Sequence, residues 1–263
     1  MNTSMTGGIC WASPATEPGP QTMMKHMLWR GMLSGILGAL IAATFALVFA
    51  EPKIDAAIAF EAAHAAHAMP GMDEELVSRT VQKTAGLYTA MLMYGTALGG
   101  LFAIVFAVLY GRVVQIGPRS LSLLLALATV VVIVLVPALK YPPTPPAVGL
   151  HETVRLRTVA YFGMLGFSVL AAVAGVWIRR RLSGRSSAID AILGGVVGYV
   201  ALVAALQLLL PTIDEVPATF PASLLWQFRI ASIATQTVLF VVIGIAFGWQ
   251  IDRTMRNRGM AGR

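Results

Sequence analysis

The sequence has 263 residues, of which 57% are hydrophobic and only 12% are charged. A soluble domain usually has about 25% charged residues, and here the apolar residues form separate long blocks, so the composition excludes an ordinary soluble protein. The net charge of +7 does not indicate nucleic-acid binding, because the basic residues lie between the apolar blocks, where they orient membrane proteins. The single cysteine, Cys10, excludes an internal disulfide and cysteine-based metal clusters.

Residues 1–27 precede the first apolar block and are expected to form a disordered tail. Residues 1–22 lack a basic segment followed directly by an apolar run, so they do not form a convincing signal peptide. They are either a native tail or an over-long start, since Met23, Met24 and Met27 stand just before the first block. The sequence leaves both interpretations open.

Six apolar blocks are long enough to cross a bilayer, because a helix rises about 1.5 Å per residue and about 20 residues span the hydrocarbon core. They predict an all-α polytopic bundle over residues 28–253, followed by a basic tail over residues 254–263. Pro137 and the Lys140–Pro143 run are expected to close the third helix. The blocks are Leu28–Ala50, Leu87–Tyr110, Leu121–Leu139, Val159–Ile178, Ala188–Leu210 and Ile230–Ile251.

The distribution of charge predicts the orientation of these helices. The side with both termini holds 12 of the 19 basic residues, including the Arg179–Arg181 run, so both termini are expected in the cytoplasm. The other side holds 9 of the 12 acidic residues, which would raise the local concentration of cations there. Outer loops of membrane proteins are also often acidic without any such function.

Small residues recur at helical spacing within the blocks, and glycines four apart let two helix backbones approach closely. The pattern predicts a compact bundle but leaves open whether these contacts are internal or belong to a homo-oligomer. The glycines are Gly31, Gly35, Gly38, Gly95, Gly99, Gly100, Gly194, Gly198, Gly244 and Gly248.

Polar side chains within the predicted helices are few, and no Asp, Glu or Arg lies near the centre of any of them. Gln207 and Gln236 are the most informative, because an amide in lipid must find a partner. They either form hydrogen bonds between helices or line a polar path.

The first outer loop contains the strongest pattern of candidate metal ligands. Glu61, His64 and His67 are spaced by three and, on the helix that the surrounding alanines favour, share one side. Imidazole binds late first-row divalent ions, and carboxylate or thioether groups can complete the shell. The nearby candidates are Met69, Met72 and Asp73. A solvated helix without a ligand is the alternative, and these ligand types do not distinguish nickel, cobalt, copper and zinc.

Two further outer loops contain polar candidates. His151 and Glu152 follow a proline-rich run and form either a second ligand pair or part of a rigid lid. Asp214 and Glu215 follow the fifth helix and either pair with Arg229, which opens the sixth, or meet an incoming cation. No nucleophile elbow, His-Glu-x-x-His motif or phosphate-binding loop occurs, so no enzymatic activity is expected and ATP hydrolysis by this chain is excluded.

The run YPPTPPAVG followed by HETVRLRT, together with the run DEVPATFPASLLWQFRIAS, resembles the CbtA family of probable cobalt transporter subunits. The resemblance covers about residues 27–253. It implies cobalt uptake across a bacterial inner membrane, with no permanently bound cofactor, and a small CbtB-type partner with one membrane helix and a histidine-rich tail. The family is usually described with five helices, whereas this sequence predicts six.

Two functional hypotheses follow from different classes of protein. The first is a subunit that captures cobalt or a similar divalent cation at its outer loops and passes it through the bundle. The second is a non-transporting assembly, sensing or binding subunit of another membrane complex, which the lack of a buried charge favours. A membrane-embedded enzyme is the weakest interpretation, because the helices contain no cluster of Asp, His or Cys.

Overall fold

The computed structural model describes residues 20–65, 77–112, 116–146, 148–149 and 153–261, and this part of the chain is helical without strands. It confirms the predicted all-α bundle, because six of its helices are long and apolar enough to cross a membrane. These spans are Met24–Phe49, Arg79–Leu109, Pro118–Lys140, Val154–Leu182, Ala188–Leu209 and Ala222–Asn257.

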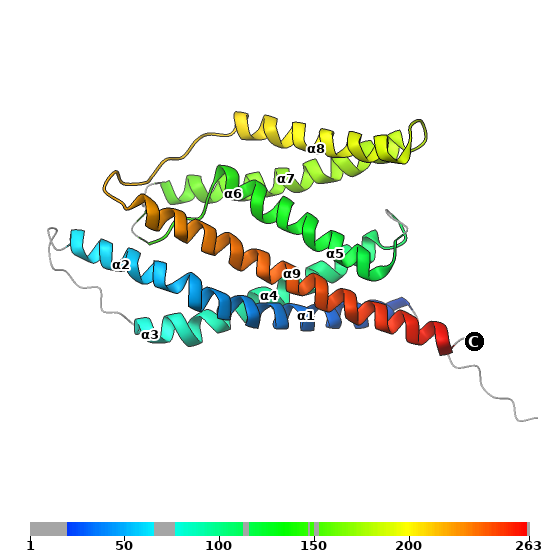
Figure 1. Cartoon of the computed structure of the whole chain (residues 1–263), viewed down its shortest axis with the longest axis horizontal. Coiled ribbons are helices and arrows are strands. Elements are labelled where there is room, and N and C mark those ends of the chain that lie inside the picture. Colours follow the sequence, from blue (N-terminus) through cyan, green and yellow to red (C-terminus); the bar gives the residue numbers. More distant parts are fainter. Residues whose placement is uncertain (1–19, 66–76, 113–115, 147, 150–152, 262–263) are drawn as a thin grey trace, which may run out of the picture.

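The long helices run side by side along one axis (Figure 1). In chain order the elements are α1 (Pro20–Phe49), α2 (Glu51–Ala65), α3 (Arg79–Val81), the π-helical η1 (Gln82–Gly86), α4 (Leu87–Leu109), α5 (Pro118–Thr129), the π-helical η2 (Val130–Leu135), α6 (Val136–Lys140), α7 (Val154–Leu182), α8 (Ala188–Leu209) and α9 (Ala222–Ala261).

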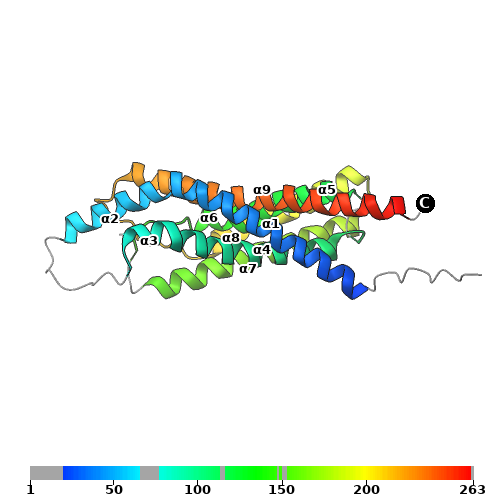
Figure 2. The same ribbon diagram turned by 90° about the horizontal axis from the view of Figure 1, so that it is seen from below.

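The start of α1 and the end of α9 lie at the same end of the bundle, here called the terminal end (Figures 1 and 2). The α7–α8 connection lies there too, and α2 extends from the opposite end, the α2 end. The loops therefore fall into the two groups expected from the charge distribution. That the terminal end faces the cytoplasm stays a prediction.

Several helices are longer than their apolar blocks. α1 already begins at Pro20 and α9 continues to Ala261, so residues 20–27 and 254–261, expected in tails, are helical. α9 begins at Ala222, which places Arg229 two turns inside the helix rather than at its start. α7 likewise begins at Val154, so Arg157 lies in its first turn. The apolar pattern marks only the core of each span, because helical hydrogen bonding continues into the polar flanks.

The third spanning helix ends at Lys140, where the Lys140–Pro143 run was expected to close it, but Pro137 itself does not end it, because the helix continues through that residue. The wider π-helical turn of η2 directly precedes it and accommodates the disrupted backbone. Side chains from neighbouring helices also hydrogen-bond to carbonyls of this region. Ser168 Oγ donates to Val132 O over 2.8 Å, and Gln207 Nε2 donates to Val136 O over 3.2 Å. Polar side chains thus satisfy backbone groups that water cannot reach in lipid.

Glycines let the backbone of α1 contact the backbone of α4 directly. A Cβ at Gly35 would overlap the carbonyl oxygen of Gly95, and a Cβ at Gly99 would overlap that of Gly31. Since lipid removes most of the hydrophobic drive between helices, this close van der Waals packing stabilises the pair. The predicted glycine contacts are therefore internal to this chain.

The same kind of contact joins two other helix pairs. A Cβ at Gly175 in α7 would lie 2.8 Å from the carbonyl oxygen of Gly195 in α8. α5 packs on α9 where Gly244 faces Ala126, and there Ser122 Oγ donates to Gly244 O over 2.7 Å. The contact between the backbones of α7 and α8 thus uses Gly195, whereas the predicted glycines at positions 194 and 198 face side chains of α7.

Gly35→Ala is expected to destabilise the protein by about 1–3 kcal/mol, because the added methyl group must push the α4 backbone away. Thermal unfolding in detergent, followed by the loss of monodisperse protein, measures the effect. Gly163→Ala in α7 is the matched control, since a Cβ there meets nothing within 4 Å. Equal stability of the two variants would contradict the proposed packing role.

Candidate functional site

The predicted metal ligands lie at the α2 end, and the structure describes only part of them. Glu61 is exposed on α2, and His64 belongs to the same helix, three residues later. The expected helix is thus present as far as Ala65. The remaining candidates, His67, Met69, Met72, Asp73, His151 and Glu152, lie outside the described residues. Within the part that is described, no three His, Cys, Asp or Glu side chains are grouped to hold a metal ion.

Ion pairs already occupy several acidic residues at the α2 end. Arg79 contacts Glu51 and also donates to Asp55 over 3.0 Å, and Lys83 donates to Asp55 over 3.2 Å. Partial burial raises the pKa of Asp55, but the hydrogen bonds from Lys83 and Arg79 outweigh it and hold this pKa below its usual value. These carboxylates therefore tie α2 to the start of the second span.

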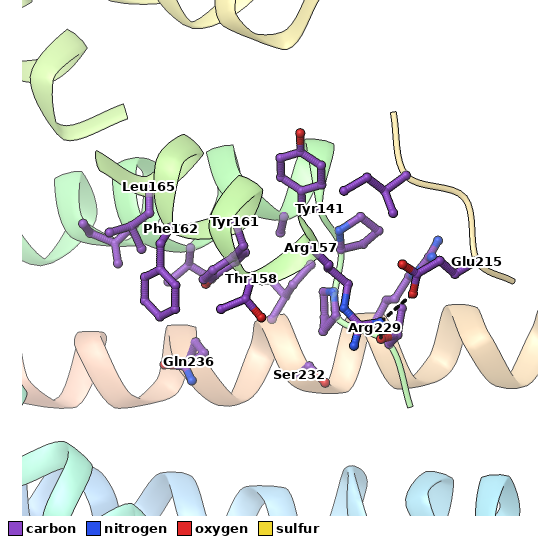
Figure 3. Close-up of a pocket in the computed structure, with 18 of the residues that line it drawn as sticks. Tyr141, Arg157, Thr158, Tyr161, Phe162, Leu165, Glu215, Arg229, Ser232 and Gln236 are labelled. Carbon is purple, nitrogen blue, oxygen red and sulfur yellow. Dashed lines mark hydrogen bonds and ion pairs between the residues drawn. The ribbon is translucent and has the colours of Figure 1, made fainter. Parts of the chain in front are cut away.

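A cavity of about 600 Å³ also opens at the α2 end, between η2, α6, α7 and α9. Figure 3 shows Ser232 and Gln236 on α9 facing Tyr161 and Leu165 on α7 across this space. Its deeper wall is apolar and includes Ile133, Val134 and Phe240, whereas charged groups gather at its outer end: Arg157, Asp214, Glu215 and Arg229.

The proline-rich segment that follows α6 forms one edge of the cavity and is fixed to the end of α8. Lys140 Nζ donates to Gln207 O over 2.7 Å, and Tyr141 Oη donates to Pro211 O over 2.8 Å. Tyr141 is buried, and this burial raises the pKa of its phenol, which therefore remains a hydrogen-bond donor. The segment thus holds Thr144 beside Arg157.

A partly buried ion pair joins α7 to the segment before α9. Arg157 Nη1 donates to Glu215 Oε2 over 2.9 Å, and only 5% of the Glu215 side chain is exposed. Arg157 Nη1 also lies 3.4 Å from Thr144 Oγ1. Gly149 packs against this pair with φ at +127°, and a Cβ there would lie 2.6 Å from Arg157 Nη1. Only glycine combines this backbone conformation with so close an approach.

Arg229 lacks the ion pair that the sequence suggested. Glu215 pairs with Arg157 instead, and Asp214 attracts Arg229 electrostatically without forming an ion pair within 4 Å. The reason is geometric, because Arg229 lies inside α9 while Arg157 stands in the first turn of α7. Asp214 is exposed and has no cation in contact among the described residues, so it remains open to the second predicted role, meeting an incoming cation.

Each of the two glutamines follows a different one of the alternatives left open above, the hydrogen bond between helices or the polar lining. Gln207 forms a hydrogen bond between helices, from α8 to the carbonyl of Val136. Gln236 lines the cavity, and its Oε1 is buried without a hydrogen-bond partner.

Sequence reasoning missed the Arg157–Glu215 pair and the cavity beside it. A signal was present, because opposite charges flank apolar blocks at the same predicted end of the bundle. Which cation faces which carboxylate depends on the separation of α7 from α9, which one-dimensional patterns do not give.

Six long apolar helices, packed through glycine and with a cavity at one end, define a multi-pass integral membrane protein. A family model described as "Probable cobalt transporter subunit (CbtA)" matches residues 24–252. The chain therefore belongs to the CbtA family, which confirms the resemblance carried by its proline-rich run and by the run around Arg229. Comparisons with curated proteins and with solved structures gave no match.

Arg157→Gln is expected to destabilise the protein by about 1–3 kcal/mol, because it leaves the buried Glu215 carboxylate without its cation. The double variant Arg157→Gln with Glu215→Gln should recover part of this loss, since no buried charge then remains unpaired. Thermal unfolding of the four proteins in the cycle measures the coupling. Arg155→Gln, an exposed change two residues earlier, is the control; a loss as large in this variant would refute the buried pair's role.

Proposed function

We propose that this protein is the multi-pass subunit of a cobalt uptake system in a bacterial inner membrane. The supporting observation is the family match, which extends across all six spans rather than one segment. The substrate is a divalent cation, with cobalt favoured by the family and similar late first-row ions compatible with the candidate ligands. The protein itself needs no permanently bound cofactor for this role.

Capture of the ion is assigned to the first outer loop. Glu61 and His64 lie three residues apart on α2, a spacing that places their Cα atoms on one side of the helix. His67, Met69, Met72 and Asp73 follow and complete the proposed ligand set. Neutral imidazole together with carboxylate and thioether groups suits cobalt better than it suits calcium or magnesium, which prefer oxygen ligands. His151 and Glu152 form the proposed second ligand pair.

Free carboxylates are proposed to concentrate the cation near this loop. Ion pairs already engage Glu51, Asp55 and Glu215. The carboxylates that attract the cation in this proposal are therefore exposed ones such as Glu61 and Asp214. The cavity is not the capture site in this proposal, because those of its lining residues that the structure describes include two arginines and no His, Cys or Met. The ion instead passes inward through the bundle after capture.

The family description as a subunit supports a partner chain. We assign this place to a CbtB-type protein with a single membrane helix and a histidine-rich tail. Its histidines would exchange the ion with the first outer loop of this chain, because imidazole ligands on both sides allow stepwise transfer.

Replacing both His64 and His67 by Ala is expected to lower cobalt uptake about tenfold or more at limiting metal, the scale of loss on weakening a metal site. Uptake of radioactive cobalt is measured in cells that express this chain with the partner. The control is His26→Ala, which removes an exposed histidine near the start of α1, at the opposite end of the bundle.

Unchanged uptake by the double variant would reject the capture role of the first outer loop. No cobalt uptake by the unaltered protein with its partner, although the two co-purify, would instead favour a non-transporting subunit. Competition by nickel, copper and zinc in the same assay ranks the substrates.

A further inference from the structure

Unpartnered buried polar atoms gather at a single place in the described part of the chain. Three buried side-chain atoms there lack any hydrogen-bond partner: Glu215 Oε1, Arg229 Nε and Gln236 Oε1. All three residues line the cavity at the α2 end. Because buried polar groups are nearly always hydrogen-bonded, these three atoms are available to a polar ligand that enters the cavity.

The positive charge of Arg229 determines which charge a ligand group beside it should have. Its guanidinium makes no hydrogen bond or ion pair with any residue that the structure describes, although it is half-buried in the cavity wall. A partly buried cation without a partner is costly, and a guanidinium matches phosphate or carboxylate oxygens best. At Arg229 the cavity therefore favours an anionic oxygen group, whereas the unpartnered Glu215 Oε1 and Gln236 Oε1 are acceptors and require a hydroxyl or another donor on the same ligand.

The remaining wall determines what the anionic group is attached to. Beyond Ser232 the cavity is lined by Ile133, Leu165 and Phe240, and it opens on one side, where Phe162 is 63% exposed. A charged end and an apolar end in one cavity match a ligand with both characters. A small hydrophilic anion would leave the apolar wall uncovered.

The depth of Arg229 in the membrane is indicated by a neighbouring aromatic residue. Trp226, three residues earlier in α9, is 65% exposed close to the end of the span, which is the position tryptophan takes at the headgroup level. Three residues correspond to about 4.5 Å along a helix. Arg229 therefore lies just inside the headgroup region, with the apolar wall extending toward the membrane centre.

We propose that this cavity binds a phospholipid, with the headgroup phosphate on Arg229 and part of one acyl chain along the wall formed by Phe162, Leu165 and Phe240. The phosphate supplies the acceptor that Arg229 lacks. The lipid fills the gap between α7 and α9 and links the α7–α8 pair to the rest of the bundle. This site is independent of the proposed cation capture at the first outer loop.

The test is native mass spectrometry of the full-length protein, purified in detergent and stripped of lipid. Dioleoyl phosphatidylglycerol is expected to bind about tenfold or more tightly than dioleoylglycerol, which has the same chains without the phosphate, given the strength of charged hydrogen bonds. Arg229→Gln should reduce phosphatidylglycerol binding to the level of dioleoylglycerol, and Arg229→Lys should retain part of it. Arg155→Gln, an exposed change outside the cavity, should have no effect.

Ser232→Phe provides a second variant, which fills the cavity without changing its charge and should also abolish binding. Three results would overturn the proposal. These are equal binding of the two lipids, unchanged binding by both Arg229→Gln and Ser232→Phe, or displacement of the lipid by millimolar inorganic phosphate, which would indicate a free-anion site.

Discussion

Close backbone contact at glycine is the interaction on which the bundle depends. In lipid the hydrophobic effect contributes little between helices, so van der Waals contact has to hold them together. α1 meets α4 where Gly35 faces Gly95, and on another side it meets α9, where a Cβ at Gly38 would lie 3.0 Å from Leu239 O. α1 thus packs on both α4 and α9, and toward the terminal end Arg30 Nη1 donates to Gln250 O of α9 over 2.7 Å.

The cavity exists because α7 and α8 form a separate pair. They pack on each other at Gly175 and Gly195 and reach the rest of the bundle chiefly through η2 and α6. Where α7 separates from α9, the charged residues at the α2 end remain close enough for the pair between Arg157 and Glu215 but leave Arg229 without a partner. The cavity between α7 and α9 is therefore lined by charged residues at the α2 end and by apolar side chains farther in (Figure 3).

The six spans and the small-residue contacts could be predicted because they depend on local periodicity and on the width of the bilayer. Family membership was also visible in the proline-rich run before α7 and in the run around Arg229. The continuation of the helix through Pro137 could not be predicted, because it comes with the π-helical turn η2 and with hydrogen bonds from Ser168 and Gln207 on other helices. The pairing of Glu215 also depends on helix separation, a property of the folded bundle. The candidate ligand residues beyond His64 stay predictions.

The central claim is that the α2 end faces outward, since both ion capture and the attraction of cations require it. Accessibility to a membrane-impermeant maleimide tests this directly in a Cys10→Ser background, with either Glu61→Cys or Ser183→Cys added. Both positions are exposed, and they lie at opposite ends of the bundle. The account predicts that intact cells expose only the cysteine at position 61, and that position 183 reacts after permeabilisation. Labelling of position 183 but not position 61 in intact cells would contradict it.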